Sequence, residues 1–423
     1  MNTEEQFKYW RRRIFISLWI TYATFYLCRV NFSVAIPGIM DEFGYTRTVL
    51  GGIATALFGA YAIGQFVNGQ LGDKFGGRIL ITVGLITSGI LNIIFGFSEI
   101  LVILTLIWAV NGYFQSMGWA PSVKTIANWF PLKSRGRVGG AYGSSYQIGA
   151  ACSLALAGFL TGALGWRWCF WIPGILVIVS AIHFWIRVRN APEEVGLPTI
   201  EEEANKTNES KGIRKDHHLG FAHTIKALGN PAIWFMAFGL FALNIVRYGF
   251  MVWAPSYMFE VQHATIPTAA YKTMMIPLAG SVGAIFAGWM SDKVFQSRRA
   301  PIAAIMLFLL GLSAWLFPQI PVEMWVLSLL CLMAIGFMTY GPHVLIVASA
   351  PMDYGTRKAA SSATGFIDGV GYVGAALTGI LSGWLTDVWG WNAAFYLWIA
   401  GAIVAGVLML LLWNYKPERG EYE

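Results

Sequence analysis

The feature that most constrains this chain is a series of apolar windows, each long enough to cross a lipid bilayer as one helix. A transmembrane helix needs about 20 predominantly apolar residues. Twelve such windows lie near 14–38, 51–71, 79–97, 102–124, 139–164, 166–187, 231–257, 267–290, 301–318, 323–347, 358–384 and 390–413. Of the 423 residues, 56% are hydrophobic and 12% are charged, against about 25% charged in soluble domains. The sequence predicts an all-α membrane protein with twelve transmembrane helices.

A polar stretch divides these windows into two sets of six. Residues 188–230 include "EEEANKTNESKGIRKDHH" and predict a cytoplasmic central loop between an N-terminal half, 1–187, and a C-terminal half, 231–423. Three histidines of this loop are interpreted as chance members of a polar segment, not as metal ligands: His217, His218 and His223. We therefore expect no metal site and no cofactor.

The distribution of cations predicts the orientation of the chain. Of the 29 Lys and Arg residues, 23 lie in the termini or in the connections on the same side as the termini. Lys and Arg are enriched in cytoplasmic loops, so both termini are expected in the cytoplasm, most simply in a bacterial inner membrane. The net charge of +7 follows from this topology and does not indicate a nucleic-acid partner.

Three pairs of similar segments indicate an internal repeat. "LCRVNFSVAIP" (27–37) matches "IVRYGFMVWAP" (245–255), and "GQLGDK" (69–74) matches "GWMSDK" (288–293). "GWRWCFW", beginning at Gly165, matches "GWNAAFY", beginning at Gly390. Matches at nearly one offset predict two pseudo-symmetric six-helix bundles in parallel orientation. Transporters built in this way place the substrate between the halves, near the middle of the bilayer.

The second pair of segments resembles the loop signature of the major facilitator superfamily. We expect its glycines to allow close approach of two helices, and its aspartates and cations to form a charge network that serves gating. The residues are Gly69, Asp73, Lys74, Arg78, Gly288, Asp292 and Lys293.

Two motifs associated with nucleotide binding give no support for that function. One occurs in the wrong structural context, and the other is absent from the sequence. "GVGYVG" (369–374) fits G-x-G-x-x-G, but it lies inside an apolar window and does not follow a strand. The sequence contains no GxxxxGK[ST] motif and no recognisable pair of nucleophile and base. We therefore expect that the protein is not an enzyme.

Charged side chains within the apolar windows are the candidate functional residues, because burying a charge in a bilayer costs about 2.5–3.5 kcal/mol. Arg29 and Arg247 occupy matching positions in the first and seventh windows, and Asp368 lies in the eleventh. His343 and Lys124 are weaker candidates. A histidine bonded to a helix neighbour and a lysine reaching the membrane surface are equally good interpretations.

We predict that the two arginines bind an anionic substrate. One carboxylate pairs with at most one of them, and a guanidinium fork suits phosphate or carboxylate. Tyr22 and Tyr26 precede Arg29 by seven and three residues and so share its helix face. Tyr61 and Gln65 pair in the same way in the second window. Positive charge without a counterion resists crossing the membrane, which favours obligatory exchange of one anion for another.

These segments are similar to the organophosphate:phosphate antiporter family of the major facilitator superfamily. The similarity is most specific in "RYGFMVWAPSY", "GWMSDKVF", "MGWAPSVKTIANWF" and "YGPHVLI". It implies a rocker-switch transporter that exchanges a phosphate ester for inorganic phosphate and functions as a monomer in the lipid bilayer. It also implies that Arg29 and Arg247 bind the phosphate. Other cavity residues implied by the similarity are Tyr22, Tyr26, Tyr61, Trp119, Tyr340 and Tyr372.

Three positions depart from the family pattern and leave alternatives open. Val30 and Gln65 stand where family members usually have lysine, and Asp368 stands where small or hydroxylated residues are common. The cavity is therefore less positive than in a typical relative. One alternative is proton-coupled symport of an organic carboxylate, such as a sugar acid, with Asp368 or His343 as the proton carrier. A second alternative is a transporter-like membrane sensor of sugar phosphate.

Overall fold

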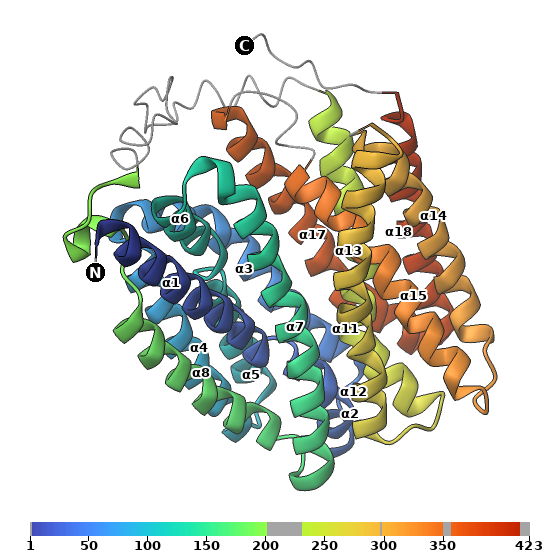
Figure 1. The fold of residues 1–423 in the computed structure, drawn as a ribbon. Helices are drawn as coiled ribbons and strands as arrows, with labels where there is room; N and C mark the ends of the chain where they lie inside the picture. Colours follow the sequence, from blue (N-terminus) through green and yellow to red (C-terminus); the bar gives the residue numbers. More distant parts are fainter. Residues whose placement is uncertain (1, 201–230, 297, 350–356, 415–423) are drawn as a thin grey trace. The chain divides into compact units, whose positions relative to one another are not determined.

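The computed structural model describes residues 2–200, 231–296, 298–349 and 357–414. Within these ranges the regular secondary structure is entirely helical (Figure 1). Twelve helical segments are long and apolar enough to cross a membrane, and each overlaps one of the windows predicted from the sequence. The predicted class, an all-α protein with twelve transmembrane helices, is confirmed.

The first six spans are formed by α1 (Thr3–Phe25) with η1 (Tyr26–Cys28) and α2 (Asn31–Phe43), α3 (Arg47–Phe75), α4 (Gly77–Phe97), α5 (Leu101–Gln115) with α6 (Trp119–Trp129), α7 (Leu132–Leu164) and α8 (Trp168–Arg187). A short turn, η2 (Pro192–Val195), follows them.

The last six spans are formed by α11 (Pro231–Glu260), α12 (Ile266–Thr273) with α13 (Met275–Lys293), α14 (Arg299–Leu316) with η3 (Phe317–Gln319), α15 (Trp325–Val344) with the π-helical turn η4 (Leu345–Ser349), α17 (Arg357–Trp389) and α18 (Trp391–Leu411). Most of the predicted central loop, including its three histidines, lies outside the described residues. The division into halves at 188–230 therefore stays a prediction from the repeat.

The chain forms two compact units whose boundaries cut across several helices. The first comprises 1–31, 60–153 and 167–217, and the second comprises 32–59, 154–166 and 218–423. Two segments of the predicted N-terminal half, 32–59 and 154–166, thus belong to the same unit as the predicted C-terminal half.

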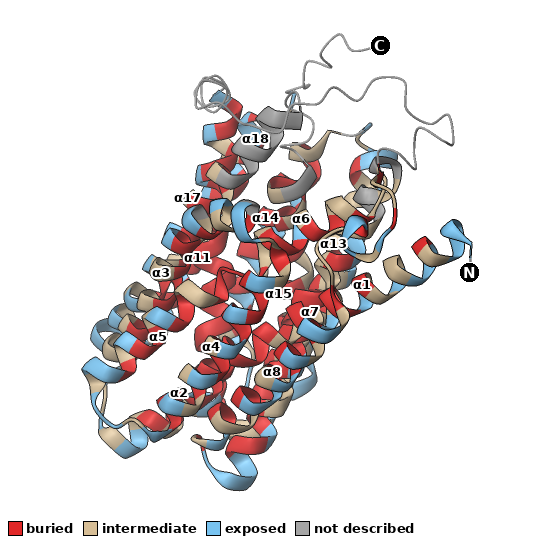
Figure 2. Cartoon of the chain, turned by 90° about the vertical axis from the view of Figure 1, so that its left-hand side faces the viewer, coloured by how far each residue is buried: buried red, intermediate tan, exposed pale blue. Residues whose placement is uncertain are grey.

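Individual helices carry one buried face and one exposed face (Figure 2). On α4, the side chains of Ile81 and Leu85 have no exposed surface. A stripe of exposed apolar side chains follows the other side of the same helix: Ile79, Val83, Ile86, Ile90 and Ile94. Lipid offers no hydrogen-bond partners, so a surface that faces it is apolar. The exposed stripe of α4 therefore agrees with a membrane-spanning role for this helix.

The first span is interrupted within the bilayer, and buried side-chain amides compensate for the interruption. The helix narrows to η1 and restarts at Asn31, so the carbonyl of Cys28 leaves the regular helical pattern. Asn111 Nδ2 donates to this carbonyl at 2.9 Å and Asn92 Nδ2 donates at 3.3 Å. Asn31 Nδ2 donates to Asn92 Oδ1 at 2.9 Å. A buried carbonyl without a partner would be costly, and these amides allow the break to persist next to Arg29.

Candidate substrate-binding site

Arg29 lies at the break in the first span, and its side chain is 6% exposed. Its Nε and Nη2 atoms donate to Oε1 of Gln115, at 3.2 and 3.0 Å. The guanidinium carbon lies 4.6 Å from the ring centre of Tyr26 and 4.5 Å from that of Tyr61. Both distances are in the range of cation–π contacts. Two aromatic rings and a neutral amide are thus among the groups that position the cation.

Gln115 is itself fixed by a buried network. It is the last residue of α5 and has no exposed surface. Its Nε2 donates to Ser88 Oγ at 2.7 Å and to the carbonyl of Phe25 at 3.1 Å. Ser88 Oγ in turn donates to Asn111 Oδ1 at 2.6 Å. Because the amide nitrogen of Gln115 donates to Ser88 and Phe25, the amide oxygen is the atom that faces Arg29.

The predicted residues Tyr22 and Trp119 belong to an aromatic cluster that adjoins Tyr26. The ring centres of Tyr22 and Trp119 are 5.2 Å apart, and those of Tyr22 and Tyr26 are 5.9 Å apart. Two tyrosines of α7 complete the cluster. Tyr142 stacks on Trp119 at 5.4 Å, and Tyr146 lies 6.0 Å from Tyr26. The structure therefore brings the predicted aromatic residues of the first unit together.

Gln65 reaches the same group of residues through Tyr61. Its Nε2 donates to the hydroxyl of Tyr61 at 2.9 Å, one helical turn away on α3. The pairing predicted from their spacing is present, and it holds the ring that lies against Arg29.

Arg247 has a closely similar environment in the second unit. It lies within the continuous helix α11, and its side chain is also 6% exposed. The guanidinium carbon lies 4.8 Å from the ring centre of Tyr248 and 4.9 Å from that of Tyr340. Its Nη1 lies 2.7 Å from Nε2 of His343. Because the guanidinium remains protonated, Nη1 is the donor and the histidine nitrogen accepts.

Two further predicted residues lie on α17, in the same unit as Arg247. The hydroxyl of Tyr248 donates to that of Tyr372 at 3.4 Å. Asp368 lies four residues before Tyr372 and is half-buried. This spacing places Asp368 and Tyr372 on the same face of the helix.

The two copies of the loop for which a gating role is predicted differ in the contacts of their residues. In the first copy, Arg78 donates from Nε and Nη2 to the carbonyl of Trp185, at 3.0 and 2.7 Å. In the second, Asp292 pairs with Arg299 at 2.5 Å. Lys74 and Lys293 are exposed. The side chain of Asp73 lies outside the described residues.

Close helix approach occurs near Gly69 and not at Gly69 itself. A Cβ atom built at Gly69 or at Gly288 meets no described atom within 4 Å. A Cβ at Gly72 would lie 3.2 Å from the ring of Pro121. The role expected for Gly69 is thus found one helical turn later. Lys124 joins this region, since its Nζ donates to the carbonyl of Gly72 at 3.4 Å.

Four residues that contact Arg29 or Arg247, or belong to the adjoining aromatic cluster, were not identified from the sequence: Gln115, Tyr142, Tyr146 and Tyr248. Tyr248 directly follows Arg247, and its ring contacts that guanidinium. Tyr142 and Tyr146 are four residues apart on α7, so a helical spacing of tyrosines was available as a signal. Gln115 offered no signal beyond being a polar residue inside an apolar window.

Twelve spans with arginines buried inside them define a polytopic membrane protein, and comparison with known proteins gives its family. The Major Facilitator Superfamily matches residues 18–378. The chain belongs to this superfamily, whose members are membrane transporters, and this excludes the enzyme classes.

Two curated relatives match almost the whole chain. The probable hexose phosphate transport protein of Chlamydia pneumoniae is 33% identical, over 97% of this chain and 93% of its own length. The membrane sensor protein UhpC of Escherichia coli K12 is 32% identical, also over 97% of this chain and 93% of its own length. These relatives support the similarity to organophosphate transporters inferred from the sequence motifs.

A solved structure supports the fold. The inward-facing, unoccupied form of a bacterial homologue of the human lysosomal transporter Spinster superposes with a TM-score of 0.71. It covers 96% of this chain and 95% of its own, at 16% sequence identity. At that identity the likeness concerns the fold alone.

Proposed function

We propose that this protein exchanges a small phosphate ester for inorganic phosphate. The observation that carries the proposal is the shared environment of Arg29 and Arg247. Each guanidinium is buried, lies against two tyrosine rings, and bonds to a neutral side chain, Gln115 or His343. Such an arrangement orients each guanidinium, a group whose N–H donors suit an anion.

The charge of the proposed substrate suits binding by arginine. A phosphate monoester has a charge of about −1.5 to −2 at neutral pH and three strong acceptor oxygens. Guanidinium groups bind such oxygens in a bidentate manner. The name of the chlamydial relative, a probable hexose phosphate transport protein, supports a sugar phosphate as the ester.

We assign Gln115 the role of a positioning residue. Two hydrogen bonds to one edge of the Arg29 guanidinium restrict the rotation of the fork. An amide achieves this without neutralising the cation, whereas a carboxylate at the same position would compensate its charge.

The positive charge of the arginines also favours exchange over one-way transport. With an anion bound, the positive charge of the arginines is balanced during the rocker-switch movement between inward-facing and outward-facing states. With no anion bound, the net positive charge of the site would oppose that movement, because a charge is costly to move through a medium of low dielectric constant. Phosphate on the opposite side supplies the balancing anion for the return.

Proton-coupled symport of an organic carboxylate is the second candidate. The observation that favours it is the half-buried Asp368, one turn from Tyr372 on the helix α17. A carboxyl group in this unit is able to take up a proton and so couple transport to a pH gradient.

The bacterial origin of the curated relatives supports a bacterial inner membrane location, and the cation distribution supports cytoplasmic termini. We further propose that the monomer is the transporting unit, since each half of the repeat supplies one arginine within a single chain.

A ligand-stabilisation experiment tests the proposed substrate. A ligand that binds the folded state raises the melting temperature according to its concentration and affinity. We expect glucose 6-phosphate, glycerol 3-phosphate or inorganic phosphate to raise the melting temperature of the purified protein, and sugar acids to have no effect. Stabilisation by sugar acids alone would contradict the proposal and support the carboxylate symporter.

A further inference from the structure

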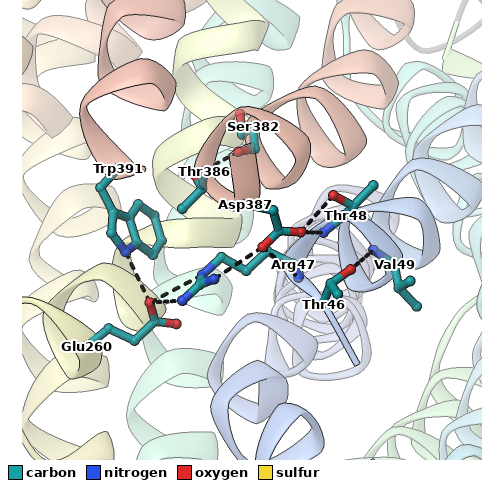
Figure 3. Close-up of polar contacts among 9 residues, drawn as sticks. All are labelled: Thr46, Arg47, Thr48, Val49, Glu260, Ser382, Thr386, Asp387 and Trp391. Carbon is teal, nitrogen blue, oxygen red and sulfur yellow. Dashed lines mark hydrogen bonds and ion pairs between the residues drawn. The ribbon is translucent and has the colours of Figure 1, made fainter. Parts of the chain in front are cut away.

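Arg47, the first residue of α3, bonds to two carboxylates on different helices (Figure 3). Its Nη2 lies 2.5 Å from Glu260 Oε2, at the end of α11. Its Nη1 lies 3.1 Å from Asp387 Oδ1, near the end of α17. The side chains are partly shielded from solvent: 25% of Arg47 and 19% of each carboxylate remain exposed. Salt screens a partly buried ion pair less than it screens a fully exposed one.

Neighbouring residues strengthen these contacts. Thr48 donates to Asp387 Oδ2 from its backbone nitrogen and from its hydroxyl, both at 2.7 Å. Asp387 therefore binds the first N–H groups of α3, where a helix has unsatisfied donors and a positive dipole end. Trp391 Nε1 donates to Glu260 Oε2 at 3.0 Å. We call these five residues the Arg47 cluster: Arg47, Thr48, Glu260, Asp387 and Trp391.

The cluster joins the two halves of the sequence repeat. Arg47 and Thr48 follow the first span, Glu260 ends the seventh, and Asp387 and Trp391 flank the connection from the eleventh to the twelfth. All these positions follow an odd-numbered span, so they lie on the membrane side opposite the N-terminus.

The helices beneath the cluster touch through their backbones. A Cβ at Gly379 of α17 would lie 2.7 Å from the carbonyl oxygen of Gly51 on α3. Thr55 Oγ1 donates to the carbonyl of Ala376 at 2.5 Å. Small residues allow helices in membranes to approach in this way. The start of α3 is thus held against α17 by both packing and charge.

The sequence repeat shows which contacts of the Arg47 cluster occur in both halves and which occur in one half. Glu42 lies 218 positions before Glu260, the same offset as Arg29 and Arg247. Trp166 Nε1 donates to Glu42 Oε2 at 2.8 Å, which repeats the bond between Trp391 and Glu260. The position 218 after Arg47, however, is Thr265. The tryptophan–glutamate bond therefore occurs in both halves, and an arginine at the position of Arg47 occurs in the first half alone.

We propose that the Arg47 cluster is a latch that keeps the transporter closed on the membrane side opposite its termini. Alternating access requires the start of α3 to separate from α11 and α17 when that side opens. The bonds of Arg47 must then break. The inference depends on alternating access and not on the identity of the anion.

A cysteine reporter beneath the cluster tests the latch without any substrate. Ala54, on α3, is 3% exposed, and Ala54→Cys is a small change. Its labelling by a membrane-impermeant maleimide is measured from the side opposite the termini, in right-side-out vesicles, with the rate of the parent chain subtracted. We expect Arg47→Ala and Glu260→Gln each to increase the labelling rate at least fivefold.

Two variants serve as matched controls. Glu42→Gln changes the equivalent tryptophan-bonded carboxylate of the first half. Arg167→Ala removes another half-buried arginine on the same membrane side, whose partner Glu99, at 3.7 Å, belongs to the same half. Both should leave the labelling rate within twofold of that of the reporter chain.

Size-exclusion profiles establish which variants are folded. Should Arg47→Ala not fold, the near-isosteric Glu260→Gln tests the proposal, because its amide oxygen still accepts a hydrogen bond from Trp391. Labelling of a folded Glu260→Gln variant at the rate of Glu42→Gln would overturn the proposal. Because no phosphate ester is present, this result is independent of whether the proposed substrate is correct.

Discussion

The guanidinium of Arg29 donates two hydrogen bonds to a single oxygen, Oε1 of Gln115. The partner is an amide whose own nitrogen is bonded to Ser88 and to the backbone of the first span. The relationship gives the buried Arg29 side chain a fixed orientation. Substitutions separate what the amide, the rings and each cation contribute to the proposed anion binding.

Gln115→Glu should weaken binding of a phosphate ester at least tenfold, which corresponds to about 1.4 kcal/mol. The new carboxylate pairs with Arg29 and compensates its charge. Gln115→Leu should weaken binding less, since it removes the positioning bonds and keeps the charge. Titration of the purified variants with glucose 6-phosphate measures both. Equal affinities for the wild type and Gln115→Glu would show that Gln115 has no influence on the site.

Arg29→Lys and Arg247→Lys should each reduce transport at least tenfold, because an ammonium replaces a bidentate fork. Uptake of labelled ester into proteoliposomes measures the effect. Arg12→Lys, at an exposed position of α1, provides the control and should transport normally. Near-normal rates in both buried-arginine variants would make these arginines structural.

Tyr61→Ala should impair ester binding more than Tyr61→Phe does. The phenylalanine ring retains the contact with the Arg29 guanidinium and loses the bond with Gln65. Alanine loses both. Affinities from ligand-dependent melting temperatures rank the two variants, and the reverse order would assign the effect to the hydroxyl and not to the ring.

Asp368→Asn distinguishes the two transport mechanisms. If the protein is an antiporter, exchange should continue at more than half the normal rate, because no proton is carried. If it is a proton symporter, uptake driven by a pH gradient should disappear. Parallel assays with trapped phosphate and with an imposed pH gradient separate the two.

Asn111→Leu should lower the free energy of unfolding by about 1–3 kcal/mol, the usual effect of losing a buried hydrogen-bond partner. The change removes the 2.9 Å bond to the carbonyl of Cys28 and the acceptor for Ser88. Thermal melts in detergent measure it, with the lipid-facing Val110→Ala as the control. An unchanged melting temperature would show that the remaining amides suffice at the helix break.

The sequence predicts the spans well because each requires a long apolar window, and a window is a local property. The repeat is also visible in the sequence, since Arg29 and Arg247 are surrounded by matching residues. The start of the first helix is predicted too late. Residues 3–13 are helical and mostly polar or charged, so hydropathy does not identify them as part of the span. A capping box between Asn2 and Glu5 fixes that end.

Contacts between distant segments are predicted less well. Gln115 is 86 residues from Arg29, and no periodicity connects two positions on different helices. Glu260 does not stand out because a carboxylate at the end of a span resembles an ordinary interfacial residue. Its importance emerges only from the approach of Arg47, which lies 213 residues away.

Counterflow in proteoliposomes is the most direct test of the central claim that the protein exchanges phosphate for a phosphate ester. Vesicles loaded with inorganic phosphate should accumulate labelled glucose 6-phosphate or glycerol 3-phosphate, and empty vesicles should not. Accumulation driven by a pH gradient alone, with no phosphate inside, would contradict the account. Binding of the ester without any transport would contradict it equally, and would identify a sensor.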